Sequence, residues 1–400
     1  MKKIAFLLIS ILSLQYAQAQ ERVITTGVPF LLVAADGRSA GLGDQGVATS
    51  ADAFSQQWNP AKYAFINKQQ GVHVSYTPYL NGLVNDISLG QLGYYNRLNE
   101  RSAFAGSLRY FSLGEINLTN SNGEPTGTVA PNEFAADLGY SLKLSEKFAM
   151  GVTGRYVRSS LKIPDANNDT AAATTFAVDV SGFFEGEEVA YNDFNGRLRL
   201  GFNFQNLGPK INYDSTVADK NSNFLPANLK IGGGYDFAFD EYSKFTLSVE
   251  FAKLLVPTPF AKVLPTDLDG DGKVTNPEET VAADANNQNV RDYKDISWTS
   301  GIFKSFNDAP GGFSEELKEV TYSVGAEYAY QDSFAVRLGY FHESPDKGAR
   351  KFFSIGAGFK YTAVKVDVSY LFNASNIKSP LENTLRFSLT IGFGDEYDSY

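Results

Sequence analysis

The 400-residue chain contains no cysteine and two histidines, His73 and His342. The lack of cysteine excludes a disulfide framework, a thiolate metal site and a cysteine nucleophile. Alternation with apolar neighbours points the two histidines to opposite faces of different strands, so we do not expect a shared histidine site. No Ser-His-Asp grouping is visible, and the sequence does not predict an enzyme. The formal net charge of −10 argues against a nucleic-acid partner, because phosphate binding requires a basic surface.

The chain also lacks an apolar run long enough to cross a membrane as a helix. The apolar run at residues 4–14 follows Lys2 and Lys3 and is shorter than the roughly 20 residues that a spanning helix needs. Ala17 and Ala19 complete a cleavage-site pattern, which predicts a signal peptide over residues 1–19. An exported chain of this kind can enter a membrane only as a closed barrel.

Alternation of apolar with polar or small residues dominates the rest of the chain, as in Phe134, Ala136, Leu138 and Tyr140. The alternating segments have the length of a tilted strand that crosses a bilayer, about 9–11 residues, whereas strands of soluble proteins have about five or six. The strand candidates are residues 72–79, 86–96, 102–113, 133–145, 148–160, 174–186, 196–208, 226–239, 243–256, 293–307, 319–331, 334–343, 352–362, 364–373 and 384–393.

A single-chain bacterial barrel needs an even number of strands, and the connections identify the segment to remove. Short turns and long loops alternate consistently from both ends of the chain only if residues 293–307 are not a strand. Trp298, Ile302 and Phe306 recur at a spacing of four, which favours a short helix there.

These patterns predict an all-β fold, a 14-stranded antiparallel transmembrane β-barrel over residues 71–393. Residues 257–318 form one large extracellular loop in this arrangement, and residues 394–400 form an acidic periplasmic tail. Outer-membrane barrels have short periplasmic turns and longer extracellular loops. We therefore expect the N- and C-termini in the periplasm and the long loops outside.

Residues 20–70 do not alternate and are expected to form an N-terminal hatch in the lumen. Non-alternating backbone cannot face lipid, because its polar groups would be unpaired there. Residues 39–65 are rich in glycine, alanine and aspartate, and glycines let backbone pack closely against the barrel wall. The alternative is a disordered periplasmic arm, which Trp58 and its aromatic neighbours disfavour.

One motif in the sequence predicts a metal-binding site. Residues 267–278 match the calcium-loop pattern, with a glycine at the position of the sharp turn. Bound Ca²⁺ would stiffen the large outer loop, and no other cofactor is expected. The alternative is an acidic loop without an ion, because the upstream prolines do not fit the helix of an EF-hand. The expected ligands are Asp267, Asp269, Asp271, Lys273 through its carbonyl, Thr275 and Glu278.

The hatch segment resembles the N-terminal hatch of the FadL-like outer-membrane barrels. The similar stretch, residues 39–61, contains SAGLGDQGVATSADA and WNPA. The hatch residues concerned are Ser39, Gly41, Gly43, Asp44, Trp58, Asn59 and Pro60.

Further stretches, spread over most of the chain, resemble the PorV family of the type IX secretion system of Bacteroidetes. The large outer loop favours PorV over its sister family PorQ. The similar stretches are VSYTPYL (74–80), DISLGQLGYY (86–95), LRYFSLGEI (108–116), VEFAKLLVPTP (249–259), FNDAPGGFSEELKEV (306–320), AVRLGYF (335–341) and PLENTLRFSL (380–389).

This resemblance implies a non-enzymatic role in the outer membrane, among its lipid and lipopolysaccharide. PorV-like proteins bind secreted cargo through the cargo's C-terminal β-domain at a SprA/Sov-like translocon. They then deliver it to a PorU-like sortase attachment complex. Exposed apolar residues often mark such binding surfaces. The outer-loop candidates for partner binding are Phe260, Trp298, Phe303, Phe306 and Phe313.

FadL-like transport of a hydrophobic small molecule is the alternative function. It requires an apolar pocket near the hatch and a lateral opening at a kinked strand. Gly232, Gly233 and Gly234, in the middle of a strand candidate, are the candidate kink. The other interpretation of these glycines is a bulge that adds curvature to the barrel.

Overall fold

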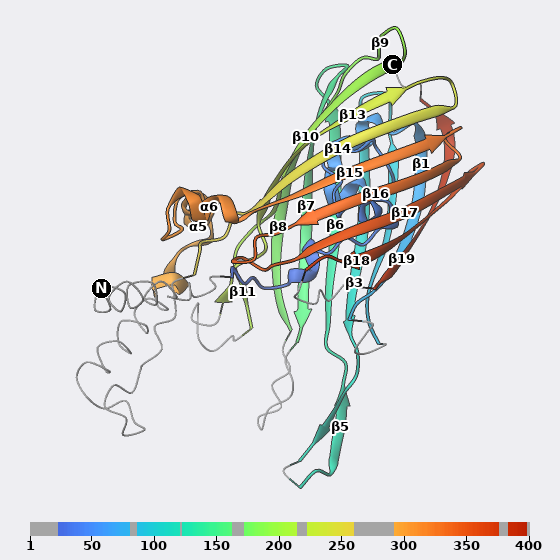
Figure 1. Ribbon diagram of the computed structural model, residues 1–400. Coiled ribbons are helices and arrows are strands. Elements are labelled where there is room, and N and C mark those ends of the chain that lie inside the picture. Colours follow the sequence, from blue (N-terminus) through green and yellow to red (C-terminus); the bar gives the residue numbers. More distant parts are fainter. Residues whose placement is uncertain are drawn as a thin grey trace, which may run out of the picture.

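The computed structural model describes residues 23–80, 86–120, 122–161, 172–213, 222–259, 292–375 and 383–397. Among these residues, fourteen antiparallel strands form a closed ring, which confirms the predicted barrel (Figure 1). The ring closes through the pairs β19–β1 and β10–β13. Its strands are β1 (Lys68–Pro78), β2 (Ile87–Arg97), β3 (Ser102–Leu113), β6 (Asn132–Lys143), β7 (Phe148–Ser160), β8 (Ala173–Glu185), β10 (Asn195–Leu207), β13 (Asn228–Ala238), β14 (Ser243–Leu254), β15 (Val320–Tyr330), β16 (Phe334–His342), β17 (Lys351–Tyr361), β18 (Val364–Asn373) and β19 (Leu385–Glu396).

The alternating side chains explain why these segments form a barrel with an apolar outer face. On β6, the side chains of Glu133 and Asp137 are buried in the lumen, while Leu138 is exposed on the outside. His73 is buried in the lumen and His342 lies on the outward-facing row of β16, as predicted. Each strand bonds its backbone to two neighbours, so apolar side chains can face lipid without exposing unpaired polar groups.

The connections divide the barrel into two ends. Short turns join the strands at one, which we name the short-turn end, and longer segments join them at the other, the long-loop end. Residues 293–307 contain a helix at the long-loop end and no barrel strand, as predicted. Figure 1 shows a hairpin and two helices projecting there. The elements of the connections are β4 (Ile116–Thr119), β5 (Pro125–Val129), β9 (Val189–Ala190), β11 (Ile211–Asn212), β12 (Ser222–Asn223), α5 (Trp298–Lys304) and α6 (Phe313–Lys318).

The first and last strands of the barrel extend slightly beyond their expected bounds. β1 begins at Lys68, before the expected start of the barrel, and β19 continues to Glu396, into the segment expected to be a tail. Lys68 Nζ and Glu396 Oε1 form an ion pair of 2.6 Å where the two strands end. Residues 1–19 and 398–400 lie outside the described residues. None of the described helices is long and apolar enough to cross a membrane.

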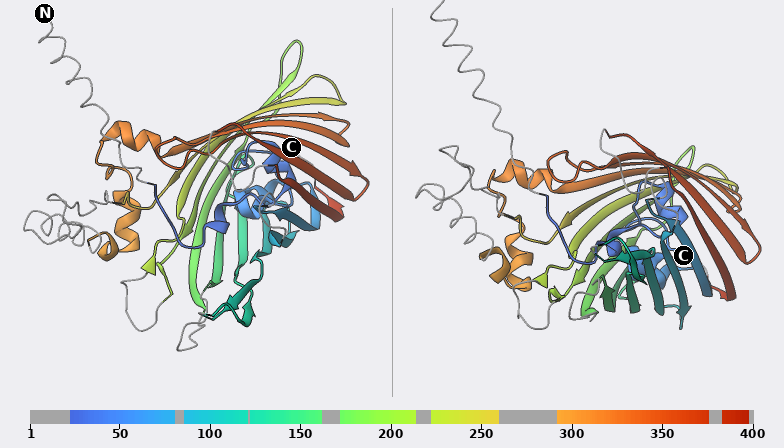
Figure 2. Two further views of the ribbon diagram at one scale, coloured as in Figure 1. Left: turned by 60° about the horizontal axis from the view of Figure 1, so that its bottom comes forward. Right: turned by 90° about the horizontal axis from the view of Figure 1, so that it is seen from below.

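The N-terminal segment lies inside the ring, as Figure 2 shows for the blue part of the chain. It begins at the long-loop end, so the expectation that both termini share the short-turn end is wrong for the described chain. Gly27 N donates a hydrogen bond of 2.9 Å to Phe224 O, in the long connection between β10 and β13. Tyr397 N donates to Asn67 O at the opposite end. The segment contains η2 (Pro29–Leu32), α2 (Gly37–Gly41), α3 (Ser55–Trp58) and η3 (Pro60–Phe65).

Apolar packing fills the lumen near the long-loop end. Val28, Phe30 and Leu31 are buried in a cluster with Leu89 of the wall and Ile211 of β11. Deeper in the lumen, polar contacts between hatch and wall accompany two further apolar clusters, one around Phe54 and Tyr63 and one around Phe65 and Phe183. The two layers together fill the lumen along much of its length.

Candidate functional site

Trp58 is the largest fully buried side chain of the hatch, and polar groups surround its ring. Its Nε1 donates a hydrogen bond of 2.8 Å to Asp36 Oδ2. The other oxygen of Asp36 accepts from Ser39 N at 2.7 Å and caps the start of α2. Lys230 Nζ of β13 lies 4.1 Å from the centre of the Trp58 ring. Trp58 therefore joins α2 and α3 to the barrel wall.

Asn59 connects the next part of the hatch to the wall. Its Nδ2 donates to Val47 O at 2.8 Å and to Gly182 O of β8 at 3.0 Å. Its Oδ1 accepts from Ala61 N at 3.1 Å, which caps η3. Pro60 occupies the start of η3, where its missing N–H costs no helical hydrogen bond. Each residue of the WNP motif therefore has an identified structural role in the hatch.

Gly43 and Asp44 turn the hatch backbone against β16 with positive φ angles of 83° and 58°. A side chain at Gly43 would lie 2.8 Å from Tyr340 O, so only glycine fits this approach. The Asp44 carboxylate pairs with Arg386 Nη1 of β19 at 2.7 Å. This turn is therefore held by backbone contact and by charge.

The wall is also shaped to receive the hatch. Gly201 of β10 faces inward, and a side chain there would overlap Val47 O. On β14, Glu250 Oε2 accepts hydrogen bonds from Gly46 N at 2.7 Å and Val47 N at 2.8 Å. Both contacts fix the hatch loop around residue 47.

Arg38 of α2 is the centre of a buried ionic network between hatch and wall. Its guanidinium pairs with Asp52 of the hatch at 2.7 Å and with Glu327 of β15 at 3.0 Å. Glu327 also pairs with Arg337 of β16 at 2.5 Å. Removing a charge from water costs free energy, so a buried charge needs oppositely charged partners that compensate for this cost.

Two hatch groups have shifted pKa values. Burial opposes ionisation of Asp52, but the nearby Lys62 and Arg38 outweigh it and hold the pKa of Asp52 at about 2. Burial lowers the pKa of Lys62 to about 8, partly offset by Asp52. The Lys62 Nζ donates to Gly46 O at 2.9 Å and to Thr49 Oγ1 at 3.0 Å. Asp52 therefore stays charged because the hatch itself places Lys62 and Arg38 beside it.

Sequence reasoning identified Asp44, Trp58 and Asn59 of the hatch, but it missed Arg38, Asp52 and Lys62 of the hatch and the wall residues of these contacts. Glu250, Glu327, Arg337 and Arg386 stand at inward positions of alternating strands, and that position was the available signal. Their partners could not be identified, because Arg38 and Glu327 are 289 residues apart in the chain.

A cavity of about 460 Å³ lies between the hatch and the short-turn end. Phe54 and Ile66 of the hatch line its floor, and charged residues such as Arg199, Asp236 and Lys365 line its walls. The Arg199 and Asp236 side chains form an ion pair. The cavity therefore differs from the apolar pocket that FadL-like transport requires.

The three glycines of β13 are neither a kink nor a bulge. Gly232, Gly233 and Gly234 pair without a break in register with both β10 and β14. A side chain at Gly232 would lie 2.7 Å from Val47 Cγ1, and one at Gly234 would lie 3.0 Å from Ala48 O. These inward glycines make room for the hatch, and the strand stays regular because its backbone bonds are complete. A register shift instead occurs in β10, between residues 204 and 207.

Residues 297–319 carry α5 and α6 at the long-loop end, and we name them the outer platform. Phe303 and Phe313 are 78% and 76% exposed, and Phe306 is also exposed. Trp298 is half-buried. Phe260 and the predicted calcium ligands from Asp267 to Glu278 lie outside the described residues. Three of the five predicted partner-binding residues are therefore exposed rings on the outer platform.

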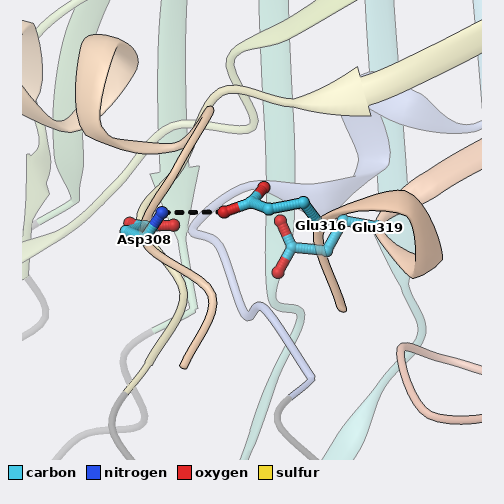
Figure 3. A group of neighbouring side chains, drawn as sticks. All are labelled: Asp308, Glu316 and Glu319. Atoms are coloured by element: carbon cyan, nitrogen blue, oxygen red, sulfur yellow. Dashed lines mark hydrogen bonds between the residues drawn. The ribbon is translucent and has the colours of Figure 1, made fainter. Parts of the chain in front are cut away.

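Buried carboxylates fix the outer platform to the barrel. Asp308, Glu316 and Glu319 converge within 4.8 Å, and Glu316 Oε1 accepts a hydrogen bond from Asp308 N at 2.7 Å (Figure 3). Lys253 Nζ pairs with Glu316 at 2.9 Å and Glu319 at 2.7 Å, and Lys347 Nζ pairs with Glu319 at 2.9 Å. Two ammonium groups therefore pair with two of the three carboxylates of a cluster that otherwise resembles a cation site.

The pKa values of this cluster agree with an ionic anchor. Burial raises the pKa of Asp308. Burial would also raise the pKa of Glu319, but hydrogen bonds from Lys253, Lys347 and Thr258 outweigh it and lower that pKa. Glu319 therefore stays charged between the two lysines. The anchor joins α6 to β14 and to the connection after β16.

Solved structures with a similar fold include several FadL-like channels. The TodX deltaS2S3 mutant, a monoaromatic hydrocarbon channel, is 10% identical with a TM-score of 0.51, over 90% of this chain and 99% of that chain. A toluene transporter TodX of Pseudomonas putida is 11% identical with a TM-score of 0.49, over 92% and 98%. A FadL homologue of Pseudomonas aeruginosa is 12% identical with a TM-score of 0.44, over 91% and 99%. At this level of identity, the likeness to the TodX mutant shows the fold alone.

No curated protein matches the sequence of this chain. A sequence model of one family, described as type IX secretion system protein PorV, matches residues 16–261. The match covers more than half of the 400 residues and includes the hatch and the strands from β1 to β14. The chain therefore belongs to the PorV family of type IX secretion system proteins.

Proposed function

We propose that this chain binds the C-terminal β-domain of secreted proteins on its outer platform and delivers them to the attachment complex. The PorV and FadL-like families are transport or secretion families rather than enzyme families, and the PorV family belongs to the outer membrane. In the proposal, the long-loop end faces outward, cargo arrives from a SprA/Sov-like translocon, and a PorU-like sortase complex receives it.

The observation that carries the proposal is the group of exposed rings on a fixed support. Phe303, Phe306 and Phe313 expose apolar surface to solvent, which is costly unless a partner covers it. The salt bridges of Lys253 and Lys347 hold the support in place. Exposed rings on a rigid support bind with less loss of conformational freedom than rings on a flexible one.

The test removes the rings without moving their support. A Phe303→Ser, Phe313→Ser variant should bind a purified cargo β-domain at least about tenfold more weakly, because each lost aromatic anchor costs about 1 kcal/mol or more. Ser300→Ala, Ser314→Ala on the same helices is the matched control and should bind normally. Calorimetry with the intact chain in detergent measures both, and unchanged affinity of the first variant contradicts the proposal.

Passive transport of a hydrophobic small molecule has weaker support. The names of the similar structures describe channels for aromatic hydrocarbons, but the identity to this chain is low. The charged cavity and the regular β13 do not supply the features that transport requires. Purification in mild detergent separates the two functions: secreted proteins should copurify, whereas bound lipid without protein would favour transport.

We further propose that the outer loop binds Ca²⁺ through Asp267, Asp269, Asp271, Thr275, Glu278 and the carbonyl of Lys273. The support is the complete twelve-residue spacing of the sequence motif. An Asp267→Asn, Asp271→Asn variant of the intact protein should lose Ca²⁺ affinity by about tenfold or more in calorimetry, because two charged ligands are removed. Asp284→Asn in the same loop is the control. Equal heats in all three proteins would contradict the site.

A further inference from the structure

Phe224, at the long-loop end, connects the outer platform to the segment that fills the lumen. We name residues 23–33 the N-terminal arm. Phe224 O accepts the hydrogen bond from Gly27 N at 2.9 Å. A side chain at Gly27 would lie 2.6 Å from Ile211 Cγ2, so the arm is tightly packed where it enters the barrel. The backbone of Phe224 therefore holds the start of the arm.

The ring of Phe224 supports α5. A side chain at Gly301, the buried residue of α5, would lie 3.0 Å from Phe224 Cε1 and 3.1 Å from Pro257 Cγ. Tyr293 packs edge-on against the Phe224 ring with 5.5 Å between centroids, and Lys210 Nζ lies 4.3 Å from the ring centre. The same residue thus holds the N-terminal arm through its backbone and the outer platform through its ring.

The arm is strained at the residue that follows this contact. Val28 adopts φ 46° and ψ 52°, a left-handed conformation that is rare for a β-branched residue. Such a conformation costs free energy and persists only where the surroundings enforce it. Here the surroundings are the Gly27 contact on one side and the burial of Phe30 and Leu31 on the other. Loss of the first contact would favour release of the arm.

The hatch below the arm has independent supports. Arg38 pairs with Glu327, and Glu250 accepts from the backbone of residues 46 and 47, far from Phe224 in the chain. Gln57 Nε2 of the hatch donates to Val33 O at 2.6 Å, so the arm stays attached at its last residue, and release of residues 23–31 does not require the hatch to move.

We infer that the outer platform and the N-terminal arm form one mechanical unit, so that displacement of α5 releases residues 23–31 from the long-loop end of the lumen. The inference deepens the proposed function and rests on it for its biological meaning: a partner that binds the outer platform and lifts α5 would unseat the arm. The physical claim itself concerns two packed segments and can be tested without a partner.

The absence of native cysteine allows labelling without background. Leu31→Cys reports on the arm, because Leu31 is 4% exposed, and Ala64→Cys reports on the hatch, because Ala64 is fully buried. Gly301→Leu displaces α5 from Phe224 and keeps the exposed rings. Ser300→Leu, at an exposed position of the same helix, is its matched control.

Each reporter is treated with a soluble maleimide in the intact, detergent-solubilised chain. Gly301→Leu should raise the labelling rate at Leu31→Cys at least about fivefold, the lower range of ordinary coupling between sites. Ser300→Leu should leave it unchanged, and Ala64→Cys should stay protected in both backgrounds. An unchanged rate in Gly301→Leu, an equal rise with Ser300→Leu, or a parallel rise at Ala64→Cys would each overturn the inference.

Phe224→Ala is the second variant if Gly301→Leu does not assemble as a barrel. Phe224→Ala removes the ring that packs against α5 and should raise the labelling rate at Leu31→Cys by the same factor. An unchanged labelling rate would also overturn the inference. The proposed function is judged separately, by cargo affinity of the Phe303→Ser, Phe313→Ser variant. Normal affinity there with increased labelling here would reject the function and keep the mechanical unit.

Discussion

Charged side chains inside the barrel form pairs across the boundary between hatch and wall. Arg38, Asp44 and Glu250 each have partners on the opposite side of this boundary. Burial removes these charges from water, and the partners compensate for that cost. The hatch is therefore held by specific side chains in addition to its shape.

The first residue-scale prediction concerns Arg38. Arg38→Ala leaves Glu327 and Asp52 buried with fewer partners and should lower the free energy of unfolding by about 3–5 kcal/mol. Urea titration of the protein in lipid vesicles measures this change. Lys318→Ala breaks an exposed pair with Asp346 and should cost less than about 1 kcal/mol. Similar losses for both variants would contradict a structural role of the buried pair.

The pKa of Lys62 predicts how the stability of the folded protein depends on pH. Burial lowers its pKa in the folded protein to about 8, from the ordinary lysine value of 10.5 that the unfolded chain keeps. In this window the unfolded chain binds a proton that the folded protein has released, so Lys62 makes stability rise with pH from about 8 to about 10.5. The neutral amine still donates its hydrogen bonds to Gly46 and Thr49. As the pH rises from about 8 to about 10.5, the thermal midpoint of the native protein should therefore increase relative to that of Lys62→Met. A constant difference between the two midpoints over this range would refute the prediction.

At the scale of elements, the inner faces of the strands match the backbone of the hatch. Glycines at inward positions of β10 and β13 stand where residues 47 and 48 approach the wall. A glycine in a strand normally weakens it, and close approach of another backbone is an established reason to keep one. The strands thus form the ring and also make room for the hatch.

Gly201 provides the prediction at this scale. Gly201→Ala would drive a methyl group into Val47 O, which should destabilise the protein by about 1–3 kcal/mol and expose the loop around residue 47 to protease. Gly154→Ala on β7 is the matched control, because an added Cβ there has no atom within 4 Å. Limited proteolysis followed by mass spectrometry locates the cleavage. Equal protease resistance of both variants would show that the close approach is unimportant.

At the scale of the whole molecule, the chain traverses its own barrel before it builds the wall. The described N-terminal end and the C-terminal strand end lie at opposite ends of the ring. This arrangement brings Gly27, near the described N-terminal end, close to the segment that carries the outer platform, through Phe224. The ends of the barrel are therefore chemically distinct, with apolar rings at one and a charged cavity at the other.

The orientation in the outer membrane follows as a prediction. Val23→Cys and Phe303→Cys should react with a membrane-impermeant maleimide on intact cells, because both belong to the long-loop end. Asp240→Cys in a short turn should react only after the outer membrane is permeabilised. All three positions are exposed in the structure. Labelling of Val23→Cys together with Asp240→Cys, and not with Phe303→Cys, would place the start of the chain on the periplasmic side after all.

Local sequence patterns were sufficient to define the ring. Alternation and connection length identified all fourteen strands and rejected residues 293–307, because side-chain direction in a strand is a local property with a period of two. The glycine-rich character of residues 39–65 and the WNP motif also marked the hatch, since unpaired backbone cannot face lipid.

What lies across the lumen depends on tertiary contacts. The direction in which the hatch runs, the pairing of Arg38 with Glu327, and the role of Gly232 to Gly234 depend on contacts between residues far apart in the chain. No local pattern encodes such contacts, because a closed ring brings every strand to the same interior and leaves many possible partners for each inward side chain. The packing of the folded hatch selects one set among them.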